Sequence, residues 1–302
     1  MAEFHCTVTE EIEEERLDKF LSETNETLSR SYLQKLIKEG AVQVNGNPVK
    51  SSYKLKIGDQ VSCLVPEMKE LEVMPEEIPL SILYEDSDIL IINKPKGMVV
   101  HPAAGHTNGT VVNAVLFHCR EDLSGINGVL RPGIVHRIDM NTTGSLIICK
   151  NDLSHRFVAQ QLKEHTITRK YRAIVQGILK EDQGTINAPI GRHPSDRKRM
   201  AINHKNGKEA ITHYRVLQRF QNCTYIECIL ETGRTHQIRV HLSSIGHPLL
   251  GDSTYLAKSS SKLQGQTLHA MTLGLIHPTT HQYLEVDAPL PEYFEKLLST
   301  LK

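Results

Sequence analysis

Short strand-like segments dominate the chain from about residue 80 onward, and helices do not alternate with them regularly. A parallel sheet would require strand–helix–strand alternation, whereas hairpin-like spacings recur here. Helical periodicity is confined to Ser154–His165, Gln237–Ser244 and Pro291–Leu301. The pattern predicts an α+β domain on a mixed, mostly antiparallel β-sheet. Its strand candidates are Ile89–Asn93, Ser145–Cys149, Tyr171–Val175, Thr212–Leu217, Tyr225–Leu230 and Tyr283–Asp287.

A smaller module precedes this domain. Apolar residues at helical spacing predict helices over Arg16–Leu21 and Ser29–Lys38, with Ser29 as N-cap of the second and Gly40 as its stop. A strand over Ala41–Val44 then ends in the turn pair Asn45-Gly46, and a further short strand follows. The second helix keeps a basic face toward solvent, formed by Arg30, Lys35 and Lys38.

A polar, Pro-containing stretch separates the two modules. It is rich in glutamate and contains no apolar periodicity, so we expect a linker. The predicted boundaries are 16–67 for the small domain, 68–79 for the linker and 80–302 for the large domain.

The charge of the chain is balanced overall but uneven along its length. There are 35 basic and 35 acidic residues among 302, yet residues 130–210 hold 15 Lys and Arg against 7 Asp and Glu. A charge run is most often a solvated face. With a second basic region on the small module, a polyanionic partner becomes the better interpretation.

Composition also limits the cellular setting. No apolar stretch approaches the ~18–20 residues needed to span a bilayer, so we expect no membrane segment. The acidic amino terminus does not resemble a secretory signal. Six scattered cysteines without a CxxC pair fit a reducing compartment. We therefore expect a cytoplasmic protein.

Common nucleotide and metal motifs are missing. The sequence lacks GxxxxGK[ST], GxGxxG after a strand, and HExxH, which disfavours an NTPase, a dinucleotide oxidoreductase and a gluzincin. Sixteen histidines keep a zinc site open, but His236 and His241 are spaced off a common helix face. Packing and hydrogen bonding are the better interpretation for them.

Three segments concentrate polar side chains within otherwise structured surroundings. In Gly133–Ser145, Asp139 stands in a polar turn before an apolar strand, where a carboxylate can be aimed as nucleophile or base. A lone aspartate there more often only caps the turn. Thr168–Arg172 is a basic strand with one tyrosine. Glu231–Leu242 crowds two arginines, either of which could contact phosphate or pair with a carboxylate.

Taken in order, these segments resemble the RluA/RluD group of RNA pseudouridine synthases over most of the chain. The small module resembles an S4 RNA-binding domain, so the S4-bearing synthase D subgroup is the nearest comparison. Ile138 and Thr143 depart mildly, since the family more often has Leu and Ser there. The matching motifs are His136-Arg-Ile-Asp139, Thr142-Thr-Gly144, Lys170-Tyr171, Gly233-Arg-Thr-His-Gln-Ile-Arg-Val-His241, Gly246-His-Pro, Gly251-Asp, Asn93-Lys-Pro-Lys-Gly97 and Leu268-His-Ala270.

The resemblance implies an isomerase that converts specific uridines in structured RNA to pseudouridine without cofactor or metal. It makes Asp139 the catalytic aspartate, Tyr171 the residue that stacks on the base and is suited to removing the C5 proton, and Arg239 the partner that keeps the aspartate charged. The target nucleotide must be flipped out, and we expect Arg137 to fill the vacated space. The expected contacts to the RNA backbone are Arg192, Arg197, Lys198 and Arg199.

Two other hypotheses remain open at this point. The chain could bind RNA without catalysis, with Asp139 only structural, or it could be a histidine-rich metal-dependent hydrolase of nucleic acid. The expected RNA is a stem-loop of large-subunit ribosomal RNA, with tRNA as the alternative. We expect a monomer, because a basic surface would repel a second copy.

Overall fold

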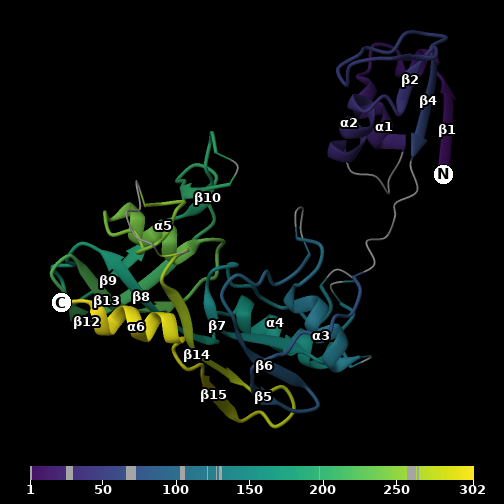
Figure 1. Ribbon diagram of the computed structural model, residues 1–302. Coiled ribbons are helices and arrows are strands. Elements are labelled where there is room, and N and C mark those ends of the chain that lie inside the picture. The colour runs from purple at the N-terminus through teal and green to yellow at the C-terminus, as the bar shows by residue number, and fades with distance from the viewer. Residues whose placement is uncertain are drawn as a thin grey trace. The chain divides into compact units, whose positions relative to one another are not determined.

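The computed structural model describes residues 2–24, 30–65, 73–102, 106–120, 122–126, 128, 131–196, 198–256, 263 and 265–302. The chain divides into two compact units, residues 1–71 and 72–302 (Figure 1). Residues 73–78 lie within the sequence expected to form the linker, but they belong to the second unit. There Val73 is buried, and the side chain of Asn113 donates to the carbonyl of Met74.

The first unit packs two helices against a four-stranded sheet. The predicted turn at Asn45-Gly46 has positive φ at both residues, as a two-residue hairpin requires. The strand β1, which the sequence did not predict, pairs with β4. The expected N-cap Ser29 lies outside the described residues. The sheet order is β1-β4-β2-β3, and the elements are β1 (Ala2–Thr7), the 3₁₀ turn η1 (Glu10–Ile12), α1 (Leu17–Thr24), α2 (Arg30–Lys38), β2 (Val42–Val44), β3 (Asn47–Pro48) and β4 (Gln60–Val65).

The second unit is built on one long sheet, in which β7 and β14 are parallel and the other strand pairs are antiparallel. The prediction of an α+β domain on a mixed, mostly antiparallel sheet is confirmed. The strand order is β5-β6-β7-β14-β8-β13-β12-β9, and β15 also pairs with β14. The strands are β5 (Ile82–Glu85), β6 (Ile89–Lys94), β7 (Thr143–Cys149), β8 (Thr168–Gln176), β9 (Gln183–Asn187), β12 (Ile211–Arg219), β13 (Cys223–Leu230), β14 (Leu268–Ile276) and β15 (Tyr283–Asp287).

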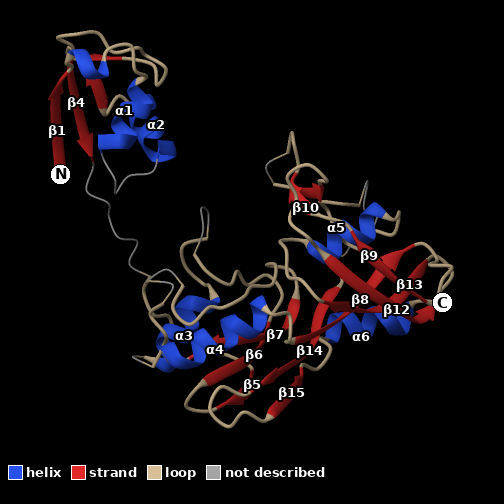
Figure 2. Cartoon of the chain, turned by 180° about the vertical axis from the view of Figure 1, so that it is seen from behind, coloured by secondary structure: helices blue, strands red, loops and turns tan. Residues whose placement is uncertain are grey.

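Helices cover both faces of this sheet. Figure 2 shows α3 (Val111–Cys119) and α4 (Asp152–Lys163) beside β6 and β7, with α5 (Gln237–Ser244) and α6 (Glu292–Thr300) at the other half. Core packing assigns α3 and α4 to opposite faces of β6–β7, and α5 and α6 to opposite faces of β8. The three helices predicted in this domain are present. A separate hairpin, β10 (Ile190–Arg192) with β11 (Met200–Ile202), lies beside α5.

The two halves of the sheet join where β7 meets β14. Gly144 pairs with Ala270 at this junction, and a Cβ built on Gly144 would lie 2.2 Å from the Ala270 carbonyl oxygen. Only glycine permits so close an approach, and its φ of 108° also favours glycine. The junction places the turn before β7, which carries Asp139, next to β8 and α5.

No helix within the described ranges combines the length and apolarity needed to cross a membrane.

Candidate active site

The Asp139 loop is fixed by hydrogen bonds to its backbone. Thr142 N–H donates to the carbonyl of Asp139, and Gly97 N–H donates to the carbonyl of Met140. The fully buried Lys94 ammonium also donates to the Met140 carbonyl at 3.0 Å, and to the carbonyls of Pro95 and Met98. Burial lowers the pKa of Lys94 to about 7, opposed by the charge of Asp139. The loop is thus held before any substrate binds.

Arg239, on α5, lies between two carboxylates. Its Nε and Nη2 donate to Asp252 at 2.7 and 2.9 Å, a bidentate pair, and its Nη1 donates to Asp139 Oδ2 at 2.9 Å. The Asp252 side chain is only 1% exposed, whereas that of Asp139 is 18% exposed. Burial alone would lower the pKa of Arg239, but its hydrogen bonds to Asp252 and the charge of Asp139 raise it. Asp252 therefore orients the arginine, and the arginine orients Asp139.

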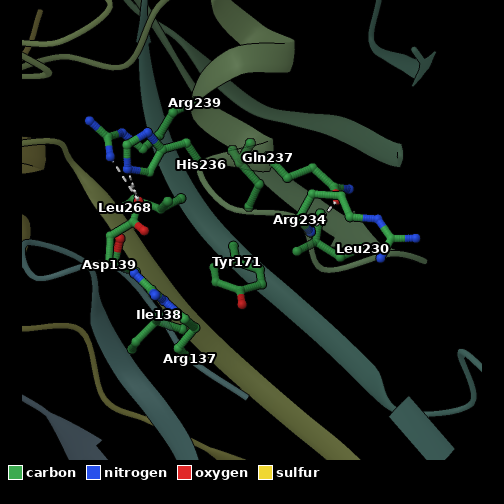
Figure 3. Close-up of a pocket in the computed structure, with 12 residues that line it drawn as sticks. Arg137, Ile138, Asp139, Tyr171, Leu230, Arg234, His236, Gln237, Arg239 and Leu268 are labelled. Carbon is green, nitrogen blue, oxygen red and sulfur yellow. Dashed lines mark hydrogen bonds and ion pairs between the residues drawn. The ribbon is translucent and has the colours of Figure 1, made fainter. Parts of the chain in front are cut away.

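His236 and Tyr255 complete this side of the site. His236 Nε2 lies 3.9 Å from Asp139 Oδ2, and its Nδ1 is 2.9 Å from the Tyr255 hydroxyl. The same hydroxyl accepts the N–H of Met200 on β11. Figure 3 shows His236 and Arg239 approaching Asp139 from one side. Burial lowers the pKa of His236 despite the nearby charge of Asp139, so a neutral imidazole is favoured.

Tyr171 lies on β8 on the opposite side of Asp139 from these groups (Figure 3). Burial raises its pKa, and the charge of Asp139 adds to the effect. Arg169 lies two residues earlier on the same face of β8, and its positive charge opposes this rise in the pKa of Tyr171.

Three adjoining cavities surround these side chains. A cavity of about 50 Å³ is lined by Asp139, Tyr171 and Arg239, with one of about 420 Å³ on the Asp139 side and one of about 460 Å³ on the Tyr171 side. Exposed Arg137 lines all three. The structure thus brings together Asp139, Tyr171, Arg239 and Arg137, four residues selected from the sequence.

The expected RNA contacts of the large domain lie on the β10–β11 hairpin. Arg192 ends β10, and Lys198 is exposed in the connection. Arg199 is less exposed, and its guanidinium lies 5.3 Å from the centre of the Tyr255 ring. Arg197 lies outside the described residues. Through Tyr255, this basic hairpin contacts His236 and Arg239, the two side chains beside Asp139.

The expected RNA contacts of the first unit lie on α2, where Arg30, Lys35 and Lys38 are all exposed. Arg30 and Arg16 both donate to the carboxylate of Asp18, which is fully buried. Hydrogen bonds from Arg16, with those of Arg30, hold the pKa of Asp18 well below its usual range. Two half-exposed guanidinium groups are thus fixed side by side.

Most of the histidines near the site bond to protein groups. His241 contacts Thr212 and the carbonyl of Ala188, and His269 contacts Thr143 and the carbonyl of Ala288. Within the described ranges, two groups of side chains have donor atoms close enough to share a metal ion, and neither includes Asp139. They are Glu85, His118 and Cys119, and Asp86, Asp88 and His277.

Sequence reasoning did not assign roles to Lys94, Asp252, Tyr255 or Arg169. The first two stand in quoted motifs, Asn93-Lys-Pro-Lys-Gly97 and Gly251-Asp, and Arg169 stands in the basic strand. Their burial is the informative feature, because buried charged groups are rare unless they are paired or functional. Only the folded chain reveals that burial.

Comparisons with known proteins match both units of the chain. Residues 88–244 match the family model described as RNA pseudouridylate synthase, and residues 15–61 match that of the S4 domain. An uncharacterized RNA pseudouridine synthase of Bacillus subtilis, YlyB, is 52% identical over the whole chain and 99% of its own length. Ribosomal large subunit pseudouridine synthase D of Zymomonas mobilis is 45% identical over 98% of this chain and 96% of its own.

A solved structure is similar as well. Human RNA pseudouridylate synthase domain containing 1 matches with a TM-score of 0.58 and 27% identity, over 74% of this chain and 86% of its own. The fold, the family model and the nearly full-length relatives define the class. The chain belongs to the RNA pseudouridylate synthase family. It is an RNA pseudouridine synthase that carries an S4 domain.

Proposed function

We propose that this enzyme isomerises uridines of large-subunit ribosomal RNA and that Asp139 is its catalytic aspartate. The observation that carries the proposal is the placement of Asp139. It is a partly exposed carboxylate, held at 2.9 Å by a buried arginine, in a cavity that it shares with Tyr171. Relatives named for the large ribosomal subunit support the choice of RNA.

The reaction breaks the N1–C1′ bond of uridine and forms a C5–C1′ bond, while C5 loses a proton and N1 gains one. Asp139 acts on the target nucleotide as a carboxylate, by attack on the sugar, by attack on the base or by assisting glycal formation. Tyr171 stacks on the base and is positioned for the C5 proton. Because burial raises the pKa of Tyr171, that second role depends on the opposing charge of Arg169.

RNA reaches the site with its target nucleotide flipped out of the helix, at a cost of roughly a few kcal/mol. Arg137 fills the vacated space, since it is exposed and lines all three cavities. The β10–β11 hairpin and the Asp18-centred arginines of the first unit contact phosphates. The proposal includes a monomer that acts in the cytoplasm and requires no cofactor or metal.

The test is pseudouridine mapping of total RNA from a strain without this gene, complemented by wild type, Asp139→Asn or Asp182→Asn. Asp182 is a matched control, because its carboxylate is 85% exposed and pairs with Arg219 at the surface. We expect specific large-subunit sites to vanish, to return with wild type and Asp182→Asn, and to stay absent with Asp139→Asn. An unchanged map overturns the proposed activity, and sites restored by Asp139→Asn overturn the role of Asp139. If tRNA sites were lost instead, the proposal that large-subunit ribosomal RNA is the substrate would be wrong.

A further inference from the structure

The cavity of about 460 Å³ on the Tyr171 side has a strongly cationic lining. Its described lining includes no carboxylate. It shares Arg137, Tyr171, Leu230 and Arg234 with the small cavity at Asp139, so the two adjoin. The charged lining side chains are Arg137, Lys163, Arg169 and Arg234, and two histidines, His136 and His165, also line the cavity.

Arg169 is the unusual member of this lining. It is only 7% exposed, its Nη2 donates to the carbonyl of Glu231 at 2.7 Å, and its buried Nε has no hydrogen-bond partner. No carboxylate in the described part of the chain forms an ion pair with it. Burial and the charge of Arg234 lower the pKa of Arg169. A buried, unpaired guanidinium destabilises a fold unless a ligand supplies the negative charge.

The backbone around Arg169 is shaped to keep it there. A Cβ built on Gly233 would lie 2.6 Å from Arg169 Nη1, so this glycine admits the guanidinium beneath the turn. The following arginine, Arg234, is anchored through Nε to the carbonyl of Glu209. In Figure 3 its guanidinium extends away from Asp139, whereas that of Arg239 points toward it. Arg234 therefore contributes to the cationic cavity rather than to the Asp139 ion pair.

We propose that this cavity is a binding site for one backbone phosphate of the RNA, adjacent to the flipped uridine on its Tyr171 side, with Arg169 as the central ligand. The inference rests on the proposed function, because the flipped nucleotide in the neighbouring cavity sets which phosphate arrives. A phosphodiester supplies the charge that Arg169 lacks, and arginine binds phosphate through paired N–H donors. An apolar or cationic group would leave the guanidinium unpaired.

The first test compares Arg169→Met with Lys170→Met. Lys170 is the adjacent residue on β8, with its side chain on the opposite face, and lines none of the three cavities. Both variants remove one charge from the same strand. Binding is measured by titrating each protein, carrying Asp139→Asn to prevent turnover, into the stem-loop RNA identified by the mapping.

We expect Arg169→Met to weaken binding about tenfold and to lower the salt slope of log K by about one, as the loss of one phosphate contact does. Lys170→Met should bind within about twofold of the parent. The melting temperature of Arg169→Met without RNA should be no lower than that of the parent, because an unpaired buried charge has been removed. Equal binding by both variants overturns the proposal.

The second test removes the charge from the RNA instead of from the protein. Single methylphosphonate linkages, which are uncharged, are placed in turn at the phosphates flanking the target uridine. One linkage should weaken binding of the Asp139→Asn protein about tenfold, and Arg169→Met should lose no further affinity at that linkage. If every linkage weakens the two proteins equally, the site does not exist. Failure of the proposed function is distinct, since wild type would then form no pseudouridine in this RNA.

Discussion

The two units use the same ion-pair chemistry with opposite polarity. In the first unit, one fully buried carboxylate, Asp18, holds two half-exposed arginines, Arg16 and Arg30. In the second unit, one buried arginine, Arg239, is held by buried Asp252 and in turn holds the more exposed Asp139. In each case the buried member fixes the direction of the exposed member.

The difference indicates which kind of ligand each surface suits. Exposed guanidinium groups at fixed positions suit phosphates, whereas an exposed carboxylate in a cavity suits chemistry on a neutral nucleoside. It follows that the buried partners, Asp18 and Asp252, should matter through the groups they position. Substitutions of these two residues should therefore affect different steps.

The largest effect is expected from Asp252→Asn. The amide places an N–H₂ group where Arg239 donates, so the guanidinium loses part of its bidentate anchor and Asp139 loses its orientation. We expect kcat to fall on the order of 10–100-fold, by analogy with lost supporting partners of active-site groups, with RNA affinity unchanged. Single-turnover kinetics and a separate binding titration measure the two. Asp182→Asn, in an exposed arginine pair, is the matched control. A fall in affinity alone would contradict this assignment.

Asp18→Asn should act on binding instead. The substitution makes the protein more positive, so simple attraction to RNA would strengthen binding. If fixed arginines are what the RNA requires, affinity should fall several-fold to about tenfold while kcat at saturating RNA is kept. Glu14→Gln is the control in the same unit, because Glu14 pairs with Lys54 at the surface. Tighter binding by Asp18→Asn would show that net charge, not position, matters there.

The stability of the two units should also respond differently to a fall in pH. The pKa of Asp18 is lowered in the fold, so its stabilisation is present above its ordinary value of 3.8 and is lost as pH falls below it. In the second unit, burial and the charge of Arg169 lower the pKa of His136 to about 3. The unfolded chain therefore binds a proton between pH 6.5 and 3 that the folded chain does not, and stability falls as pH drops through that window.

We expect the free energy of unfolding of the second unit to fall by about 2 kcal/mol from His136 alone between pH 8 and 5, while the first unit stays stable. The only histidine of the first unit, His5, is exposed. Calorimetry of the full chain from pH 8 to 5 follows both transitions. His136→Gln should flatten the pH dependence of the second, since its amide oxygen can accept the N–H of Ile147 that His136 Nε2 accepts. A parallel loss in both units would contradict the assignment.

The elements that the sequence could not predict have specific physical reasons. In β14, His269, Thr272 and Gly274 interrupt the apolar residues, so the segment has neither the alternation nor the continuous apolar run that indicates a strand. The first turn of α3 contains β-branched Val111 and Val112, which favour strands, and its helix begins at a capping box between Thr110 and Asn113. Local patterning cannot resolve either case.

The residues of the active site also divide into those that the sequence predicted and those that it did not. The resemblance selected Asp139, Tyr171 and Arg239 from ordered motifs, and the fold places all three at one cavity. It gave no role to Asp252 or Arg169, because their meaning depends on burial and on partners distant in the chain. Arg169 meets the carbonyl of Glu231 across 62 residues. Periodicity carries no information about such contacts.

The smallest effect is expected from Tyr255→Phe, which tests how far the pairing of Arg239 with Asp139 depends on its surroundings. The variant removes the hydroxyl that accepts the N–H of Met200 and meets His236, while the ring beside Arg239 stays. Loss of these bonds should cost about 1–2 kcal/mol of stability and lower kcat a few-fold, because His236 and β11 are less firmly held.

Thermal unfolding and single-turnover rates measure both effects of Tyr255→Phe. Tyr283→Phe is the control, since the exposed Tyr283 hydroxyl bonds to Glu285 and Thr168 away from the cavities. If Tyr255→Phe lost as much activity as Asp252→Asn, the Tyr255 hydroxyl would be as important for activity as the buried Asp252 carboxylate. The bidentate pair would then no longer be the main support of Asp139, and the opposed polarity of the two units would not explain their roles.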